Sequence, residues 1–214
     1  MQTTETNIRL IGMLDSPYVR RVAVSLHLMG VSFTHEPVSV FRQYDAFAAI
    51  NPVVKAPTLV TADGVTLMDS TLILEHMERL APQERRLTST DLAEHARAQR
   101  IIGLTLAACE KTVQIIYEFN LRPAEKQHRP WIDRVRSQLL SAYHLLEAEI
   151  GSGTPWLSGA RPLQADVSTA VAWRFTQHAL AGKAEGIEAK DYPGLAAFSA
   201  HAETLPAFSA FPLD

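Results

Sequence analysis

Residues 8–22 read IRLIGMLDSPYVRRV, and they join a short β-like run to the start of a helix. The run covers residues 8–13. Ser16 then stands at a helix-cap position and Pro17 at the first helical position, where each residue type is favoured. Apolar residues follow at helical spacing as far as Gly30, a typical helix end. This stretch therefore predicts a strand that leads directly into a helix.

The chain beyond that helix continues with a strand, a short helix, a hairpin and another helix. These elements are expected at residues 31–40, at 43–50, at 58–68 and from Ser70, which we expect to cap the last helix. Asn51-Pro52 ends the short helix, and Asp63-Gly64 supplies the hairpin turn. The strand–helix–strand order predicts a parallel pair with a right-handed crossover, to which the hairpin adds antiparallel strands.

The second half of the chain is predicted to be helical throughout. Apolar residues repeat at helical spacing in residues 91–120 and 131–150, and further helical stretches cover 166–181 and 193–204. The predicted buried positions of the first two helices are Ile102, Leu106, Cys109, Val113 and Ile116, and Ile132, Val135, Leu139, Ala142 and Leu146. We therefore predict an α/β domain over residues 1–81, a polar linker over 82–90, and an all-α helical domain over 91–214.

Composition narrows the classes of function. With 47% hydrophobic and 20% charged residues, the 214-residue chain is typical of globular proteins, and its net charge of −3 disfavours a nucleic-acid partner. A single cysteine, Cys109, excludes an internal disulfide and favours a reducing compartment. Residues 1–7 lack a signal-peptide pattern, and the longest apolar run, 101–109, is far below the ~18 residues of a membrane span. The eight histidines form no metal-binding pattern, so we expect no metal site. Together, these features predict a soluble cytoplasmic protein with no membrane partner.

Three short segments, in this order, resemble the cytosolic glutathione transferases, best the serine-type bacterial and plant-like members. They read LDSPYVRRV at 14–22, NPVVKAPTL at 51–59 and MDST at 68–71. The resemblance extends from Arg9 to about Phe208. It implies the glutathione transferase fold, a thioredoxin-like N-terminal domain and an all-helical C-terminal domain. It also implies a homodimer, and glutathione as a co-substrate with no other cofactor.

The resemblance gives Ser16 the central catalytic role. Ser16 matches the serine that donates a hydrogen bond to the glutathione sulfur. The start of a helix also favours an anion, and a free thiol has a pKa near 8.5, so modest stabilisation holds the thiolate near neutral pH. Taken by itself, Ser16 is equally explained as a helix cap.

The same resemblance assigns the remaining glutathione contacts. Ala56-Pro57 matches a cis-proline that leaves the Ala56 backbone free to pair with the cysteinyl part of glutathione. Lys55 and Gln43 match positions that serve the glycyl carboxylate, although both are also ordinary surface residues. The Asp69-Ser70 pair matches an acidic-Ser pair that holds the γ-glutamyl end, Ser70 taking the α-carboxylate and Asp69 lying near the α-ammonium. Asp69 is shorter than the usual Glu or Gln.

The second substrate is expected in a pocket between the two domains. The candidate lining residues are Met13, Leu14, Tyr117, Phe119, Trp173 and Phe175. Aromatic residues at helical spacing also suit a core, and Cys109 on the predicted buried face suits an inert thiol.

The function implied is conjugation of the glutathione thiolate to a small apolar electrophile, as in detoxification. Alternatives are a non-catalytic binding protein of this fold, or a glutathione-dependent peroxidase, dehalogenase or isomerase. Three departures from the family pattern stand out. Leu163 replaces the usual Ser or Thr three residues before Asp166, and Val54 stands where many relatives have Gly. The Ser16 segment lacks the adjacent Ser and following Cys of maleylacetoacetate isomerases.

Overall fold

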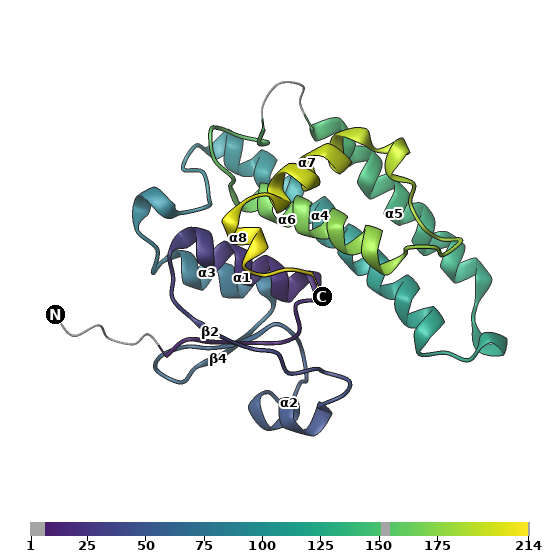
Figure 1. The fold of residues 1–214 in the computed structure, drawn as a ribbon, viewed down its shortest axis with the longest axis horizontal. Helices are drawn as coiled ribbons and strands as arrows, with labels where there is room; N and C mark the ends of the chain where they lie inside the picture. The colour runs from purple at the N-terminus through teal and green to yellow at the C-terminus, as the bar shows by residue number, and fades with distance from the viewer. Residues whose placement is uncertain (1–6, 151–154, 214) are drawn as a thin grey trace. The chain divides into compact units, whose positions relative to one another are not determined.

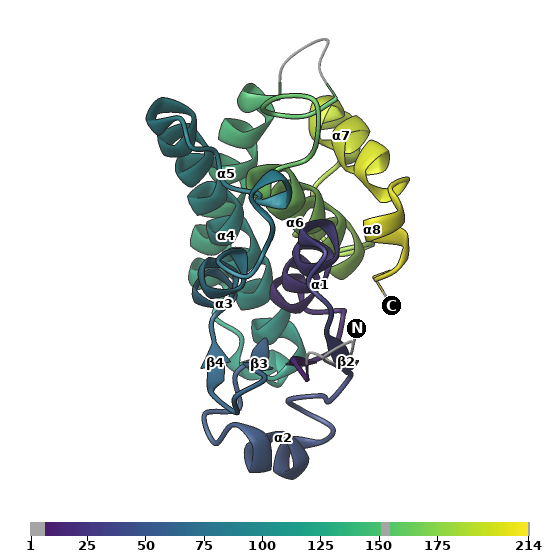
Figure 2. The same ribbon diagram turned by 90° about the vertical axis from the view of Figure 1, so that its left-hand side faces the viewer.

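The computed structural model describes residues 7–150 and 155–213. The chain divides into two compact units, and Figures 1 and 2 show the elements of each. The first unit contains residues 1–87 together with 206–214, and the second contains residues 88–205. A mixed α/β unit and a helical unit are thus present, as predicted.

The first unit is built on a four-stranded sheet in the order β2-β1-β3-β4. Its strands are β1 (Arg9–Ile11), β2 (Thr34–Glu36), β3 (Thr58–Val60) and β4 (Thr66–Met68). β1 runs parallel to β2 and antiparallel to β3, and β3 pairs antiparallel with β4, which confirms the predicted parallel pair and hairpin. Helices α1 (Pro17–Met29) and α3 (Ser70–Glu78) lie on one side of the sheet, and α2 (Tyr44–Ile50) lies on the other (Figures 1 and 2).

Helix α1 begins and ends where the sequence predicts. Ser16 is its N-cap, Pro17 occupies the first turn, and Gly30 ends it in the left-handed conformation with φ of 70°. Most of the helix surface is buried, including Arg20 and Arg21, because strand β1, helix α3 and a C-terminal segment all pack against it.

That C-terminal segment corrects the predicted domain boundary. Helix α8 (Pro206–Ser209) and the residues after it group with the first unit, not with residues 91–205. Phe208 is fully buried beneath the Arg20 guanidinium, and the Phe211 ring stacks on Phe33 at 5.6 Å between centroids. The linker is also shorter than the predicted residues 82–90, because Leu87 packs into the core of the first unit.

In its described residues, 88–150 and 155–205, the second unit contains four long helices. They are α4 (Leu92–Asn120), α5 (Arg129–Glu149), α6 (Gln164–Ala179) and α7 (Pro193–Glu203). The short 3-10 turns η2 (Ala124–Lys126) and η3 (Ala189–Asp191) lie between them, and a third, η1 (Gln83–Arg85), belongs to the first unit. Helix α4 packs along both α5 and α6. All five predicted positions of α5 are buried, as expected.

The buried face of α4 agrees only in part with the prediction. It contains two threonines: Thr105 pairs with Thr169 of α6 at 3.2 Å between hydroxyl oxygens, and Thr112 pairs with Thr176 at 2.8 Å. Ile101, Ala108 and Ile115 are also buried. Of the predicted positions, Ile102 and Cys109 are buried as expected, whereas Leu106, Val113 and Ile116 are only half-buried. Hydroxyl groups that bond to each other lose little on burial, so threonines can occupy this interface. The spacing of apolar residues alone therefore identifies only part of the buried face.

Asp166 stabilises the start of α6 despite the departure at Leu163. Its two carboxylate oxygens accept the backbone N–H groups of Leu157 at 2.7 Å and Leu163 at 2.8 Å. Leu163 has no side-chain acceptor to offer in return, so only half of a capping box is present. Burial raises the pKa of Asp166 to about 6, against the opposing effect of the two N–H donors.

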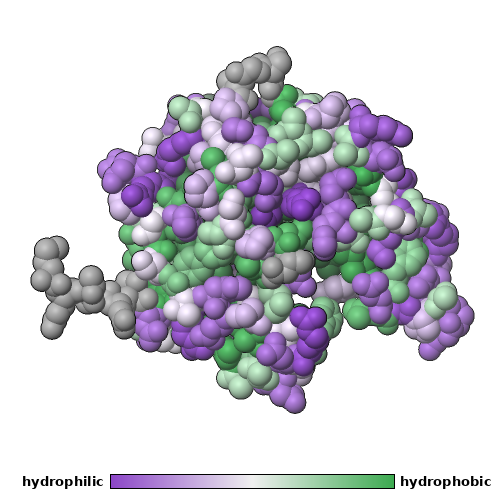
Figure 3. Space-filling view, viewed as in Figure 1, coloured by the Kyte–Doolittle hydropathy of each residue, from purple (hydrophilic) through white to green (hydrophobic). Residues whose placement is uncertain are grey.

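Hydrophilic and hydrophobic residues are interspersed on the face drawn in Figure 3. Within the described ranges, no helix has the length and apolar character that crossing a bilayer requires.

Candidate functional site

The Ser16 hydroxyl lies at the N-terminus of α1, in the loop that leaves β1. Its Oγ accepts the Val19 backbone N–H at a long distance of 3.4 Å, and the side chain is half-buried. A hydroxyl that accepts through a lone pair keeps its own proton for donation. Capping the helix and donating to an anion are therefore compatible roles for this one side chain.

Gly12 brings the end of β1 against the loop before β3. Its φ of +137° is disfavoured for residues with a side chain. A Cβ atom at Gly12 would lie 2.6 Å from Val19 Cγ2 and 3.2 Å from Ala56 Cβ. The start of α1, which Ser16 caps, and the Ala56 backbone are thus held side by side.

The Ala56–Pro57 peptide bond is cis, as the resemblance implies. Ala56 is half-buried and lies just before β3, outside the strand pairing, which begins at Thr58 opposite Ile11. The loop is braced from within: Thr58 Oγ1 donates to the Lys55 carbonyl at 2.8 Å and accepts from Asn51 Nδ2 at 2.8 Å. Its backbone can therefore present a fixed edge to an extended ligand.

Asp69 and Ser70 lie at the junction of β4 and α3. Asp69 is the N-cap, accepting the Thr71 N–H through Oδ1 at 2.9 Å, so Ser70 is the first helical residue and not the cap that we predicted. Asp69 has a φ of 73°, a value that costs energy for a residue other than glycine and is concentrated at functional sites. Ser70 is buried, and its hydroxyl accepts from Arg21 Nη1 at 2.9 Å.

Gln43 and Lys55 are both exposed. Gln43 stands just before α2, where its Oε1 accepts the Ser39 N–H at 3.0 Å. Its amide nitrogen is left to donate to a ligand, because the oxygen makes this bond. The structure thus leaves both residues accessible at the surface of the first unit.

The apolar candidates for the second-substrate pocket divide by burial. Met13 is half-buried, Tyr117 is 42% exposed and Phe119 is half-buried against the core of the helical unit. Leu14 is buried in the core of the first unit. Trp173 is a core residue of the helical unit, with ring contacts to Tyr143 at 5.2 Å and to Tyr192 at 5.7 Å, and the nearby Phe175 is also buried. Trp173 and Leu14 are therefore core residues of their units, where their side chains pack against protein atoms.

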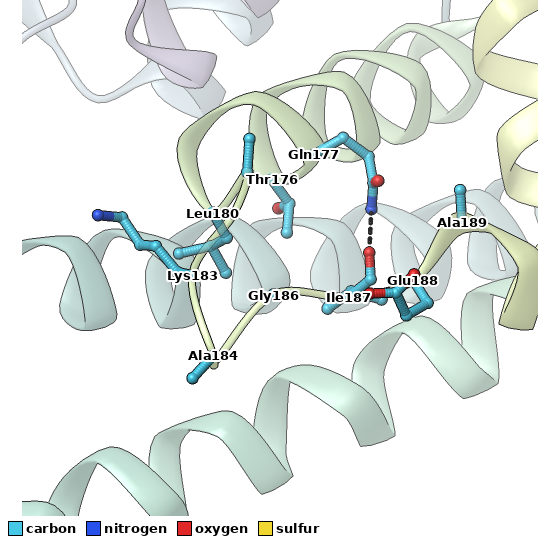
Figure 4. A pocket seen from close by; sticks show the side chains of 11 residues that line it. Thr176, Gln177, Leu180, Lys183, Ala184, Gly186, Ile187, Glu188 and Ala189 are labelled. Atoms are coloured by element: carbon cyan, nitrogen blue, oxygen red, sulfur yellow. Dashed lines mark hydrogen bonds between the residues drawn. The ribbon is translucent and has the colours of Figure 1, made fainter.

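A cavity of about 720 Å³ opens within the helical unit, at the end of α6 and the loop that follows. Figure 4 shows Gln177 and Ile187 across it, joined by a hydrogen bond of 3.0 Å from Gln177 Nε2 to the Ile187 carbonyl. None of the predicted site residues lines this cavity. Among residues 7–150 and 155–213, no group of three His, Cys, Asp or Glu side chains is placed to hold a metal ion.

Sequence reasoning missed Arg21 and Gly12. A signal for Arg21 was available, because it stands within the helical repeat of apolar residues from Val19 to Met29, where a charge has to find a buried partner. Gly12 ends the first apolar run, and a glycine there often marks a close backbone approach.

Comparison with known proteins assigns both parts of the chain to one family. Residues 10–85 match the family model of the glutathione S-transferase N-terminal domain, and residues 129–201 match that of the C-terminal domain. The chain is 28% identical over 149 residues to an uncharacterised GST-like protein, YibF, of Escherichia coli K12, covering 69% of this chain and 72% of that protein. It is 29% identical over 154 residues to maleylacetoacetate isomerase of Pseudomonas aeruginosa, covering 69% and 71%.

Among solved structures, the fold is similar to a glutathione S-transferase from Methylobacterium radiotolerans in complex with glutathione sulfonate. The TM-score is 0.86 at 23% identity, over 96% of this chain and 94% of that one. Both domains, in order, are accounted for by one family. The chain therefore belongs to the glutathione S-transferase family.

Proposed function

We propose that the protein is a glutathione transferase that activates the glutathione thiol with Ser16 and joins the sulfur to a small apolar electrophile. The observation that carries the proposal is the close approach at Gly12, which brings Val19, in the first turn of the helix that Ser16 caps, and Ala56, in the cis Ala56–Pro57 loop, to the same place. A cysteinyl group paired with the Ala56 backbone would bring its sulfur to the start of α1. The similar Methylobacterium protein binds glutathione sulfonate, which supports a ligand of this class.

The chemistry follows from the donors at that point. The Ser16 O–H donates to the sulfur, and the helix N-terminus adds partial positive charge, so the thiolate is favoured and its proton passes to solvent. The sulfur lone pair then forms the bond to the electrophilic carbon. In a substitution the leaving group departs with its bonding pair, and in an addition the π pair moves onto the neighbouring atom of the electrophile, which takes a proton from solvent. No group on the protein changes its covalent state.

The other parts of the proposal concern binding and assembly. Ser70 and the start of α3 take the γ-glutamyl α-carboxylate, Asp69 lies by the α-ammonium, and Lys55 and Gln43 serve the glycyl carboxylate. Met13, Tyr117 and Phe119 remain candidates for contacts with the electrophile. We also propose a homodimer in the cytoplasm, the compartment supported by a lone, buried Cys109.

A glutathione-dependent isomerase is the second candidate, because of the similarity to the Pseudomonas aeruginosa isomerase. In such a reaction the sulfur adds to the substrate and is later eliminated, so glutathione is recovered unchanged. The two functions are separated by whether a stable glutathione adduct accumulates.

The test is a pH–rate profile of the wild type and Ser16→Ala with chlorodinitrobenzene, an enone and an organic hydroperoxide. We expect Ser16→Ala to lower the rate near neutral pH by roughly 10- to 150-fold, the equivalent of one hydrogen bond to a charged group. Part of the loss should return as the pH rises and the thiol ionises unaided. Glutathione affinity should change only a few-fold, because the charged ends of the tripeptide bind elsewhere.

Ser16→Thr is the matched control, since it keeps the hydroxyl and should retain most of the activity. Superimposable profiles for the wild type and Ser16→Ala would show that Ser16 only caps the helix and that another group, such as Tyr18, activates the sulfur. Glutathione binding without turnover of any substrate would instead favour the non-catalytic alternative.

A further inference from the structure

Two adjacent arginines of α1 are buried and point to different places. Arg20 donates from Nε to the Phe211 carbonyl at 2.8 Å, and its guanidinium covers the Phe208 ring at 5.8 Å from the centroid. Arg21 donates from Nη1 to Ser70 Oγ at 2.9 Å and to Thr71 Oγ1 at 3.2 Å. Arg20 thus contacts the C-terminal segment, whereas Arg21 contacts the first two residues of α3.

The contact with Arg21 fixes the polarity of the Ser70 hydroxyl. A guanidinium has donors and no acceptor, so Ser70 Oγ must accept in this pair and its own proton is left to donate elsewhere. The first N–H groups of α3 also lack carbonyl partners within the helix. A buried serine held in this way is a donor to an anion.

The charge of Arg21 acts in the same direction. Only 3% of the residue is exposed, and Ser70 is 4% exposed, so little water separates the guanidinium from a group bound at Ser70. Electrostatic attraction is stronger in such surroundings than at a surface. An arginine placed one hydrogen bond behind the serine favours a carboxylate over a neutral group.

We propose that Arg21 is a positioning residue for the γ-glutamyl α-carboxylate of glutathione, acting through the Ser70 hydroxyl. This inference rests on the proposed function, because it concerns the same ligand. Arg21 directs the Ser70 proton toward the carboxylate and supplies the positive charge behind it. It selects for that carboxylate and does not touch the thiol chemistry at Ser16.

The test measures binding by calorimetry with two ligands: glutathione, and γ-aminobutyryl-cysteinylglycine, which lacks only that carboxylate. We expect Arg21→Met to weaken glutathione binding roughly tenfold or more, as for loss of a bond to a charged group, and to leave binding of the analogue almost unchanged. Arg21→Lys should restore part of the preference for glutathione, because an ammonium also donates and carries charge. Ser70→Ala should remove the preference on its own, and adding Arg21→Lys to it should have little further effect.

Arg20→Met is the matched control, with the same change one position away in the same helix. It should lower thermal stability without altering the ratio of the two affinities. An equal loss for both ligands in Arg21→Met and Arg21→Lys would overturn the inference and make Arg21 a residue of the fold alone. If Arg21→Met does not fold, the Arg21→Lys and Ser70→Ala pair decides: independent effects of the two changes would also overturn it. A wild type that binds neither ligand overturns the proposed function instead, and the inference with it.

Discussion

Gly12 and Ala56 approach so closely that a Cβ atom at Gly12 would lie 3.2 Å from that of Ala56. Val19 closes the same space from the side of α1, at 2.6 Å. The end of β1, the first turn of α1 and the distant loop before β3 therefore meet where Gly12 has no side chain. The spacing between the start of α1 and the Ala56 loop depends on this contact.

We expect Gly12→Ala to destabilise the first unit and to weaken glutathione binding. Gly64→Ala is the matched control, since Gly64 also has a positive φ, of 86°, but meets nothing within 4 Å. Both changes incur backbone strain of about 1–2 kcal/mol, and Gly12→Ala adds overpacking of about 1–3 kcal/mol. Urea unfolding and calorimetry measure the two effects, and equal losses for both variants would contradict the close approach.

Val54→Gly should stabilise the protein. Val54 is a β-branched residue with a φ of 52°, a conformation that costs about 1–2 kcal/mol. Glycine adopts this conformation freely, but it lowers stability by about 0.5–1 kcal/mol because it gives the unfolded chain more conformational freedom. The net gain is up to about 1 kcal/mol, a rise of roughly 2–4 °C in Tm. Val53→Gly, at an exposed neighbour outside the left-handed region, should lower Tm. A fall in both variants would show that Val54 carries no strain.

Asp166 should make stability fall as the pH rises from about 4 to about 6. Its pKa is about 6 in the folded protein and 3.8 in the reference state, so in this range the unfolded chain releases the proton while the folded protein keeps it. The resulting loss in the free energy of unfolding approaches about 3 kcal/mol above pH 6. Urea unfolding between pH 4 and pH 7 should show the advantage of the wild type over Asp166→Asn shrinking by that order, and a constant difference would place the pKa near its ordinary value.

Phe208→Ala should destabilise the first unit by about 3–5 kcal/mol, as expected for a fully buried aromatic residue. Phe41→Ala, at a 58% exposed position, is the control and should have little effect. All three tryptophans, at positions 131, 156 and 173, belong to the second unit, so their fluorescence reports on that unit. The stability of the first unit is therefore measured by amide hydrogen exchange in β1 and α1, where Phe208→Ala should reduce protection. Unaltered protection there would contradict the assignment of the C-terminal segment.

Much of the first unit could be predicted because its signals are local. Pro17 and Gly30 mark the ends of α1, and Asp63-Gly64 marks a turn, by backbone preferences that do not depend on distant residues. The site residues Ser16, Ala56 and Ser70 came from the family resemblance. Their spacing alone does not bring them together.

The features that the sequence did not reveal depend on long-range packing. Thr105 and Thr112 are buried only because Thr169 and Thr176 stand opposite them, and a hydropathy pattern counts each as polar. Arg21 is satisfied by Ser70, 49 positions away. The return of Phe208 to α1 likewise has no local signature, since an apolar residue after a helix suits either domain.

The membership of residues 206–213 in the first unit has a consequence for how the protein is made. A ribosome releases β1, α1 and α3 early, but the phenylalanines that cover Arg20 and Phe33 emerge only after the whole helical unit. The first unit therefore begins to fold first and is completed last. During synthesis it exposes the apolar surface of α1 that Phe208 later covers. A fragment ending at residue 87 would keep that surface exposed permanently.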